Sequence, residues 1–116
     1  MILNDLQQVL LGIDENTYYG TAALHPKDAP WDYIVFSRDT MNRTKDKSGY
    51  ADYILVELVR EEFVPDELVD EVISGVEGLA GFRLCEGQHE YWYAVKPSTH
   101  LTVEKLVLKF AHARKK

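Results

Sequence analysis

The chain has 116 residues, a hydrophobic fraction of 46% and a charged fraction of 28%, which is typical of one globular domain and excludes an intrinsically disordered chain. No stretch approaches the roughly 20 apolar residues of a membrane-spanning helix, and the first residues lack the basic-then-apolar pattern of a secretory signal. The formal net charge of −6 argues against a general nucleic-acid binder. We therefore expect a single domain, residues 1–116, in the cytosol.

The first third of the chain predicts one helix and one clear strand. Residues 2–11 place their leucines on one helical face, and Gly12 can end that helix. Residues 17–30 contain glycine and two prolines and predict an irregular segment with one edge strand. Residues 31–37 (WDYIVFS) are aromatic and β-branched, which predicts a strand.

A polar stretch, residues 38–50 (RDTMNRTKDKSGY), separates this strand from the next one, which begins near Ala51. Hairpin loops usually take about two to five residues, so the sequence predicts an unusually long polar hairpin loop. A solvated mobile loop and a loop that becomes ordered against a partner both account for this excess.

The middle of the chain predicts a strand followed by an amphipathic helix. Ile54, Val56 and Leu58 share one strand face, and the apolar period changes from two to about 3.6 at Pro65. The helix has an inner apolar stripe, made of Val69, Val72, Ile73, Val76, Leu79 and Ala80. Its outer stripe is polar, made of Glu67, Asp70, Glu71, Ser74 and Glu77. Such a helix is stable only when its apolar stripe packs on a sheet.

The last third of the chain predicts three more strands, at residues 82–86, 90–96 and 101–111, with a tight turn near Gly87 between the first two. Residues 112–116 (HARKK) predict a basic flexible tail. The element order is α-β-β-α-β-β. We expect an α+β fold with a four- to five-stranded mixed or antiparallel sheet and two helices packed on one face.

No catalytic, metal or cofactor motif is present. The four histidines show no i, i+4 pair, and a pair of Cys85 with His89 would straddle a turn with nothing to activate the thiol. The glycines at 75–81 lack the spacing and setting of a nucleotide loop. The aromatic run Tyr91-Trp92-Tyr93 could stack on bases, but its alternation predicts that at least one side lies in the core. We expect a protein that is not an enzyme and that takes no cofactor or metal.

The charges are distributed unevenly. Between Asp52 and Glu77 there are nine acidic residues against Arg60 alone, whereas the stretch from Lys105 to Lys116 has five basic residues and no acidic one. Unlike charged surfaces on identical subunits can meet head to tail and close a ring. The hypothesis is that the basic loop and tail of one copy contact the acidic helix face of the next. The candidate interface residues are Arg43, Lys45, Lys47, Arg114, Lys115 and Lys116 on the basic side, and Asp66, Glu67, Asp70 and Glu71 on the acidic side.

Four stretches together resemble a small protein of tailed bacteriophages and prophages, related to the head–tail joining and tail-terminator (neck) proteins. They are PWDYIVF (30–36), YADYILV (50–56), EEFVP (61–65) and VEKLVLKF (103–110). The resemblance covers about residues 31–116 and adds a matching N-terminal helix. It implies an α+β subunit of a ring, commonly a hexamer, that caps the tail tube and joins it to the capsid, with the long hairpin loop facing neighbours or the lumen.

The resemblance also implies partners and a location. The partners are further copies of the chain, the tail tube and the head-completion or connector proteins, with no membrane and no sequence-specific nucleic acid. The location is the bacterial host cytoplasm during assembly and then the virion tail or neck. A neighbouring head-completion role also suits the acidic helix face. Two other classes stay open from the residues alone: a monomeric α+β module that binds a ligand or nucleic acid, and a small enzyme whose site is assembled by the fold.

Overall fold

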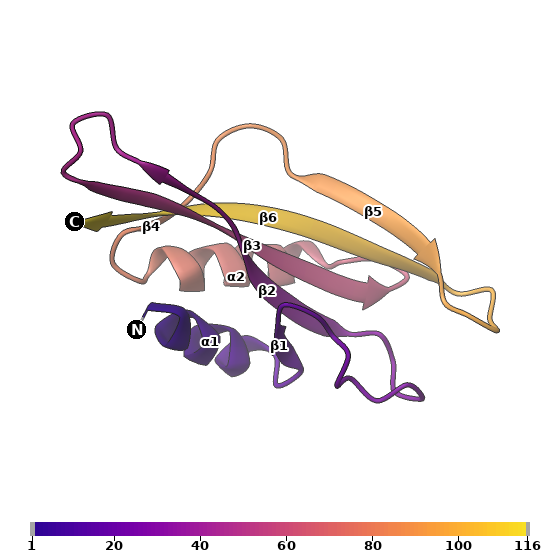
Figure 1. Ribbon diagram of the computed structural model, residues 1–116. Helices are drawn as coiled ribbons and strands as arrows, with labels where there is room; N and C mark the ends of the chain where they lie inside the picture. Colours follow the sequence, from indigo (N-terminus) through magenta and orange to yellow (C-terminus); the bar gives the residue numbers. More distant parts are fainter. Residues whose placement is uncertain (1, 116) are drawn as a thin grey trace.

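The structure is a computed structural model that describes residues 2–115. Within these residues it contains two helices and a six-stranded sheet (Figure 1). The elements are α1 (Ile2–Ile13), β1 (Thr17–Tyr19), β2 (Tyr33–Arg43), β3 (Gly49–Glu61), α2 (Asp66–Glu77), β4 (Phe82–Leu84), β5 (Glu90–Val95) and β6 (Thr102–Lys115). The predicted α+β class is confirmed, and the sheet has six strands rather than four or five, because the edge strand predicted within residues 17–30 forms as β1 beside the five others.

The sheet order is β1-β2-β3-β6-β4, with β5 also paired to β6. The β1–β2 pair is parallel and the other pairs are antiparallel. Its central ladder joins β3 and β6 from the pair Gly49 and Lys115 to the pair Glu61 and Val103. The molecule is elongated along these strands, with extents of 52 × 26 × 24 Å.

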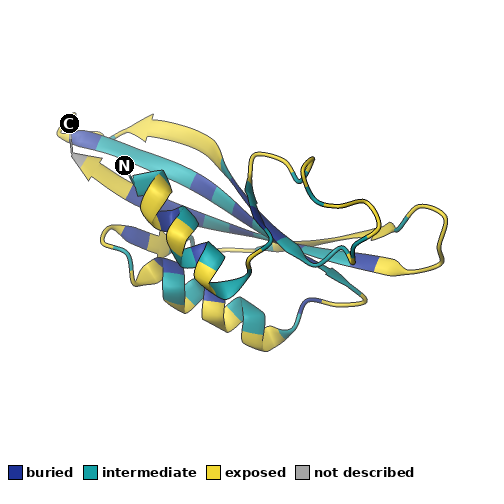
Figure 2. Cartoon of the chain, turned by 90° about the horizontal axis from the view of Figure 1, so that it is seen from below, coloured by how far each residue is buried: buried dark blue, intermediate teal, exposed yellow. Residues whose placement is uncertain are grey.

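Both helices pack on the same face of the sheet (Figures 1 and 2). The alternating residues of β3 that the sequence assigns to one face, Ile54, Val56 and Leu58, are at most 2% exposed beneath the helices. Leu6 and Leu10 of α1 and Val72 and Val76 of α2 complete this core together with alternate residues of β2 and β6, namely Ile34, Phe36, Leu106, Leu108 and Phe110. The opposite face of the sheet carries no helix in the described part of the chain and is called the open face below.

The stripes predicted for α2 agree with the structure except at one end. Val72 and Val76 are buried, and Glu67, Asp70, Glu71, Ser74 and Glu77 are all exposed. The stripe stops earlier than predicted because the helix ends at Glu77, and Ala80 is exposed in the turn that follows. Gly81 closes this turn at φ +85°, and a Cβ there would lie 3.2 Å from the His112 ring.

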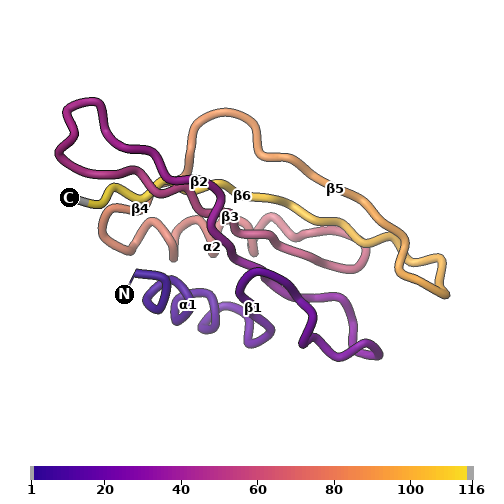
Figure 3. The backbone as a smooth tube through the Cα atoms, in the orientation of Figure 1, coloured from indigo at the N-terminus to yellow at the C-terminus, as the bar shows by residue number. Residues whose placement is uncertain are grey.

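The prediction of a long loop over residues 38–50 is wrong. β2 and β3 continue to pair as far as Arg43 and Tyr50, past a bulge at Asp39, and only residues 44–48 form the turn. Tube and ribbon both show this hairpin extending past the helices (Figure 3). Most side chains in this part of β2 are exposed, whichever face of the sheet they lie on. The sequence therefore does not alternate between apolar and polar residues here, and the period-2 pattern by which a strand is recognised is missing.

The prediction of a flexible basic tail over residues 112–116 is also wrong for the described part. β6 continues to Lys115 and pairs with the start of β3, and Arg114 lies beside Tyr50 in the register. The Arg114 guanidinium contacts the Asp52 carboxylate at 2.9 Å and lies 4.8 Å from the Tyr50 ring centre. Lys116 lies outside the described residues.

The predicted hairpin around Gly87 is absent, because β4 and β5 do not pair with each other. Both run antiparallel to β6 along the same edge, and residues 85–89 bulge out between them. His89 spans this bulge: its Nε2 lies 3.0 Å from the Cys85 carbonyl oxygen, and its Nδ1 lies 3.3 Å from the Lys109 backbone nitrogen. The ring therefore donates through Nε2 and accepts through Nδ1, a tautomer inferred from these partners. The sequence around Gly87 therefore resembles a hairpin, although its two strands lie one after the other along the same edge of β6.

The core face of the sheet and the outer face of α2 predict opposite mutational results. Leu108→Ala removes a side chain that is 2% exposed and should lower the free energy of unfolding by about 2–5 kcal/mol. Glu71→Lys changes only the solvent side of α2, and its effect should stay within about 0.5 kcal/mol. Urea unfolding followed by circular dichroism measures both, and a Glu71→Lys loss as large as that of Leu108→Ala would contradict the assignment of the helix faces.

Candidate subunit interfaces

The structure brings the predicted basic residues together at one end of the molecule. Arg43 ends β2, Lys45 and Lys47 lie in the hairpin turn, and Arg114 lies near the end of β6 beside the hairpin. We call Arg43, Lys45, Lys47 and Arg114 the basic end. Lys115, the last residue of β6, also belongs to this end of the sheet, whereas Lys116 lies outside the described residues. Arg43, Lys45 and Lys47 are exposed and form no ion pair within residues 2–115.

An internal hydrogen-bond network shapes the hairpin turn. The Asp46 carboxylate accepts the Ser48 hydroxyl at 2.7 Å, the Ser48 N–H at 3.0 Å and the Thr44 hydroxyl at 2.8 Å. These donors, with Ser48 contributing most, lower the pKa of Asp46 from 3.8 to about 2. Lys47 takes a positive φ of 61° in this turn, and this backbone conformation sets the direction of the chain at the tip of the hairpin.

The acidic candidates lie far from the basic end. Asp66, Glu67, Asp70 and Glu71 are all exposed on α2, which begins just beyond the opposite end of β3. The 13 residues of β3 separate the hairpin from this corner, which at about 3.3 Å per residue is about 40 Å. Within one copy, the basic end therefore cannot reach the start of α2.

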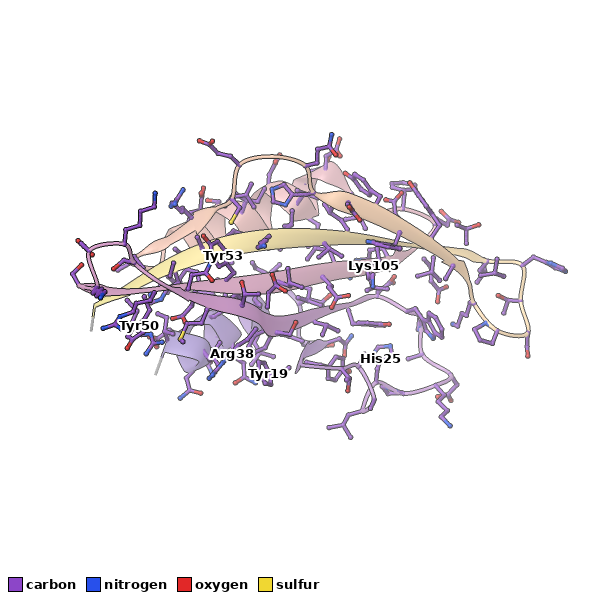
Figure 4. The ribbon with its side chains drawn as sticks, turned by 45° about the horizontal axis from the view of Figure 1, so that its top comes forward. Tyr19, His25, Arg38, Tyr50, Tyr53 and Lys105 are labelled. Carbon is purple, nitrogen blue, oxygen red and sulfur yellow. The ribbon has the colours of Figure 1, made fainter. Side chains whose placement is uncertain are left out.

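Charged residues on the open face mostly pair with one another. Lys105 contacts the Glu57 carboxylate at 2.9 Å, and Lys109 contacts that of Asp39 at 3.2 Å while lying 4.9 Å from the centre of the Tyr53 ring. Figure 4 shows Tyr53 and Lys105 on this face, with the helices behind the sheet. These partly exposed pairs contribute little to stability.

β5 is the strongest feature that sequence reasoning missed. All six of its residues are exposed, and the large ones are 49% (Tyr91), 55% (Trp92), 65% (Tyr93) and 62% (Val95) accessible. The prediction that one side of this run lies in the core is therefore wrong. β5 pairs on one side with the start of β6, where neither helix buries it, and its outer edge has no strand partner among the described residues.

The outer edge of β5 lacks the usual protection of edge strands. Native proteins blunt such edges with lysine, proline or bulges, and residues 90–95 contain none of these. The outer edge of β2 beyond Phe36 is also unpaired, but it carries Arg38, Asp39 and Arg43 and a bulge. An exposed, aromatic, unprotected edge marks an interaction site.

The end of β5 is firmly attached to the rest of the fold. Tyr93 lies opposite Glu104 in the register, and that carboxylate raises the pKa of the tyrosine; Glu104 also accepts the Val64 N–H at 2.8 Å. The Lys96 ammonium contacts Glu61 at 2.9 Å, and it lowers the pKa of that carboxyl together with the Trp31 N–H. The exposed aromatic residues are thus presented on a rigid support.

A groove of about 610 Å³ lies under the hairpin, on the side of the sheet that carries the helices. Ile2, Leu3, Met41 and Ile54 form its apolar lining, and Arg38, Asp52, His112 and Arg114 are its main polar residues. Met41 is 56% exposed. The His112 ring is buried and stacks 4.6 Å from the Phe82 ring, and its Nδ1 has no hydrogen-bond partner within residues 2–115 and lies 3.9 Å from Asp52. The groove exists because the strands extend past the start of α1.

Three of the four histidines, His25, His89 and His112, make local bonds or packing contacts in the structure. His25 bridges the Tyr18 hydroxyl at 3.0 Å and the Pro30 carbonyl at 2.7 Å, and His89 bonds the Cys85 carbonyl rather than its thiol. Among residues 2–115, no group of three or more His, Cys, Asp or Glu side chains could hold a metal ion. No helix in the described part of the chain is long and apolar enough to cross a membrane.

Comparison with known proteins adds no relative: no protein-family description matches the chain, and no curated protein matches it. The assignment of function therefore depends on the geometry above and on the resemblance described from the sequence.

The turn network predicts a local pH dependence. Because the pKa of Asp46 is lowered in the folded state, its contribution to turn order is complete above its ordinary value of 3.8 and is lost as pH falls through about 2. An NMR titration should show the Ser48 amide shift following this low midpoint, and Asp46→Ala should abolish the transition. A carboxyl that titrates near 3.8 would contradict the network.

Proposed function

We propose that this protein is a structural subunit of a bacteriophage or prophage tail, which assembles with copies of itself into the tail-terminator or head–tail joining ring. The observation that carries the proposal is the exposed, unprotected aromatic edge of β5, which offers a surface for strand pairing with another molecule. The resemblance of the chain to neck proteins supplies the kind of assembly. The proposed role is structural and needs no catalytic group, cofactor or metal.

The unlike edges of the sheet favour a closed ring. Each copy has one apolar edge, at β5, and one polar edge, at β2, on opposite sides of the same sheet. When the β5 edge of one copy binds the β2 edge of the next, the growing assembly still has one free β5 edge and one free β2 edge. Further copies therefore add in the same way until the two ends meet and close the ring. The separation of the basic end from the acidic face of α2 supports the same head-to-tail arrangement.

The remaining partners follow from the proposed role. The ring would contact the tail tube on one side and the head-completion or connector proteins on the other, first in the host cytoplasm and then in the tail or neck of the virion. A hexamer is the proposed size because the resemblance implies it. The exposed acidic side of α2 also suits a head-completion ring.

Charge reversal at the basic end tests the assembly. Lys45→Glu combined with Lys47→Glu should weaken the oligomer, because it places like charges near the acidic face of the neighbour. Multi-angle light scattering at low and high salt measures the change in mass. Lys27→Glu combined with Arg83→Glu is the matched control, since it makes the same charge change at exposed positions away from the hairpin. Wild type that stays monomeric at every concentration and salt would contradict the proposed ring.

The groove under the hairpin favours a second candidate, a monomeric α+β module that binds a ligand or nucleic acid. Its volume of about 610 Å³ and its mixed lining suit a small molecule with an apolar body and an anionic group near Arg38. A strict monomer would support this candidate, and a salt-dependent gel shift of labelled single-stranded DNA would support its nucleic-acid form.

A further inference from the structure

Besides the outer edges of the three-residue strands β1 and β4, two longer stretches of strand edge lack a partner in the described chain. One is the outer edge of β5, residues 90–95. The other is the outer edge of β2 beyond Phe36, since β1 covers only Ile34–Phe36 and Gly20 bonds the Phe36 carbonyl. Each stretch presents a row of free backbone N–H and C=O groups, which is the template that strand addition uses.

We propose that β5 of one copy adds to the free edge of β2 in a second copy, with residues 91–94 paired antiparallel to residues 40–43. This inference rests on the proposed self-assembly and names the surfaces through which it occurs. It would join the sheets of neighbouring subunits into one continuous sheet around the ring.

Strand direction agrees with this pairing. β5 runs antiparallel to β6, β6 antiparallel to β3, and β3 antiparallel to β2. β5 is therefore antiparallel to β2 of its own copy. A ring can relate its copies by a rotation that leaves the strands of all copies pointing the same way. β5 of one copy then runs antiparallel to β2 of its neighbour, and the helices of both copies lie on the same face of the joined sheet.

The faces of the strands select the register. Trp92 and Ala94 lie opposite Lys105 and Val103 on the open face, and Tyr91 and Tyr93 point to the helix side. On β2, Thr40 and Asn42 share the open face with Tyr53 and Ala51, and the bulge at Asp39 ends the regular pairing. A continuous sheet needs like faces opposite each other. The register that meets this condition over all of residues 40–43 pairs Tyr91 with Arg43, Trp92 with Asn42, Tyr93 with Met41 and Ala94 with Thr40.

This register also occupies the groove. It places Tyr93 against Met41, whose exposed sulfur side chain lines the groove, and Tyr91 against the unpaired Arg43. Aromatic contacts with a thioether and with a guanidinium are both favourable. A contact between two β5 strands would leave the groove and Arg43 without a partner.

Cysteine cross-linking tests the register. In a Cys85→Ser background, Ala94→Cys and Thr40→Cys would lie directly opposite across the interface, at the Cα separation of about 4.5–5.5 Å that suits a disulfide. Under mild oxidation the double variant should give a covalent ladder of oligomers, and a mixture of the two single variants should give dimers. Val95→Cys with Thr40→Cys is the control, because these side chains lie on opposite faces and should give little product.

Each result of this experiment is decisive. Covalent dimers from Ala94→Cys alone would place two β5 strands against each other and overturn the proposal. An oligomer by light scattering without the 94–40 cross-link above the control would overturn this strand pairing and leave the proposed ring intact. A monomer at every concentration would overturn both.

A second variant tests the contact with Met41 without cysteine chemistry. Tyr93→Ala should raise the dissociation constant of the assembly at least about tenfold, as expected for an exposed aromatic residue at the centre of an interface. Leu24→Ala is the control, since Leu24 is 87% exposed and lies outside the strands. Equal dissociation constants for the two variants would overturn the proposal.

Discussion

The long ladder between β3 and β6 is the constraint on which the rest of the structure depends. It pairs every residue from Gly49 to Glu61 with a partner on β6. At about 3.3 Å per residue, the 13 residues of β3 extend for about 43 Å, whereas each of the 12-residue helices measures about 18 Å. The helices can therefore cover less than half of the ladder, and the strand segments beyond them must be stable with both faces in solvent.

That mismatch in length creates every candidate interface. At one end the ladder extends past the start of α1, which leaves the basic hairpin and the groove beneath it. Near the other end, β5 lies along β6 with both faces exposed. The hairpin is stabilised by the Asp46 turn and by Arg114 on Asp52, and β5 by its pairing with β6 and by Lys96 on Glu61 just after its end. Both extensions are thus rigid surfaces, which lowers the entropic cost of binding.

The sequence predicts the covered part of the fold well and the uncovered part poorly. The alternation of Ile54, Val56 and Leu58 and the 3.6-residue period of α2 arise from burial on one face, so they identify the core and the side of the helices. The hairpin arms and the end of β6 have no buried face, and their polar residues look like a loop and a tail. The aromatic run of β5 looks like a half-buried strand in the sequence. An alternating pattern cannot distinguish a face that is covered within the chain from a face that binds another molecule. The sequence could predict that the acidic residues of α2 face outward and that basic residues gather near the hairpin. It could not predict the groove, because the groove forms only where the strands extend beyond the start of α1.

Hydrogen–deuterium exchange as a function of protein concentration tests most directly whether assembly uses the sheet edges. The account predicts that the outward-facing backbone amides in residues 90–95 and 40–43, which are not bonded to β6 or β3, exchange quickly in dilute protein and become protected as oligomers form, while amides of the β3–β6 ladder are protected throughout. Oligomers that form with unchanged exchange in both edge segments would contradict it.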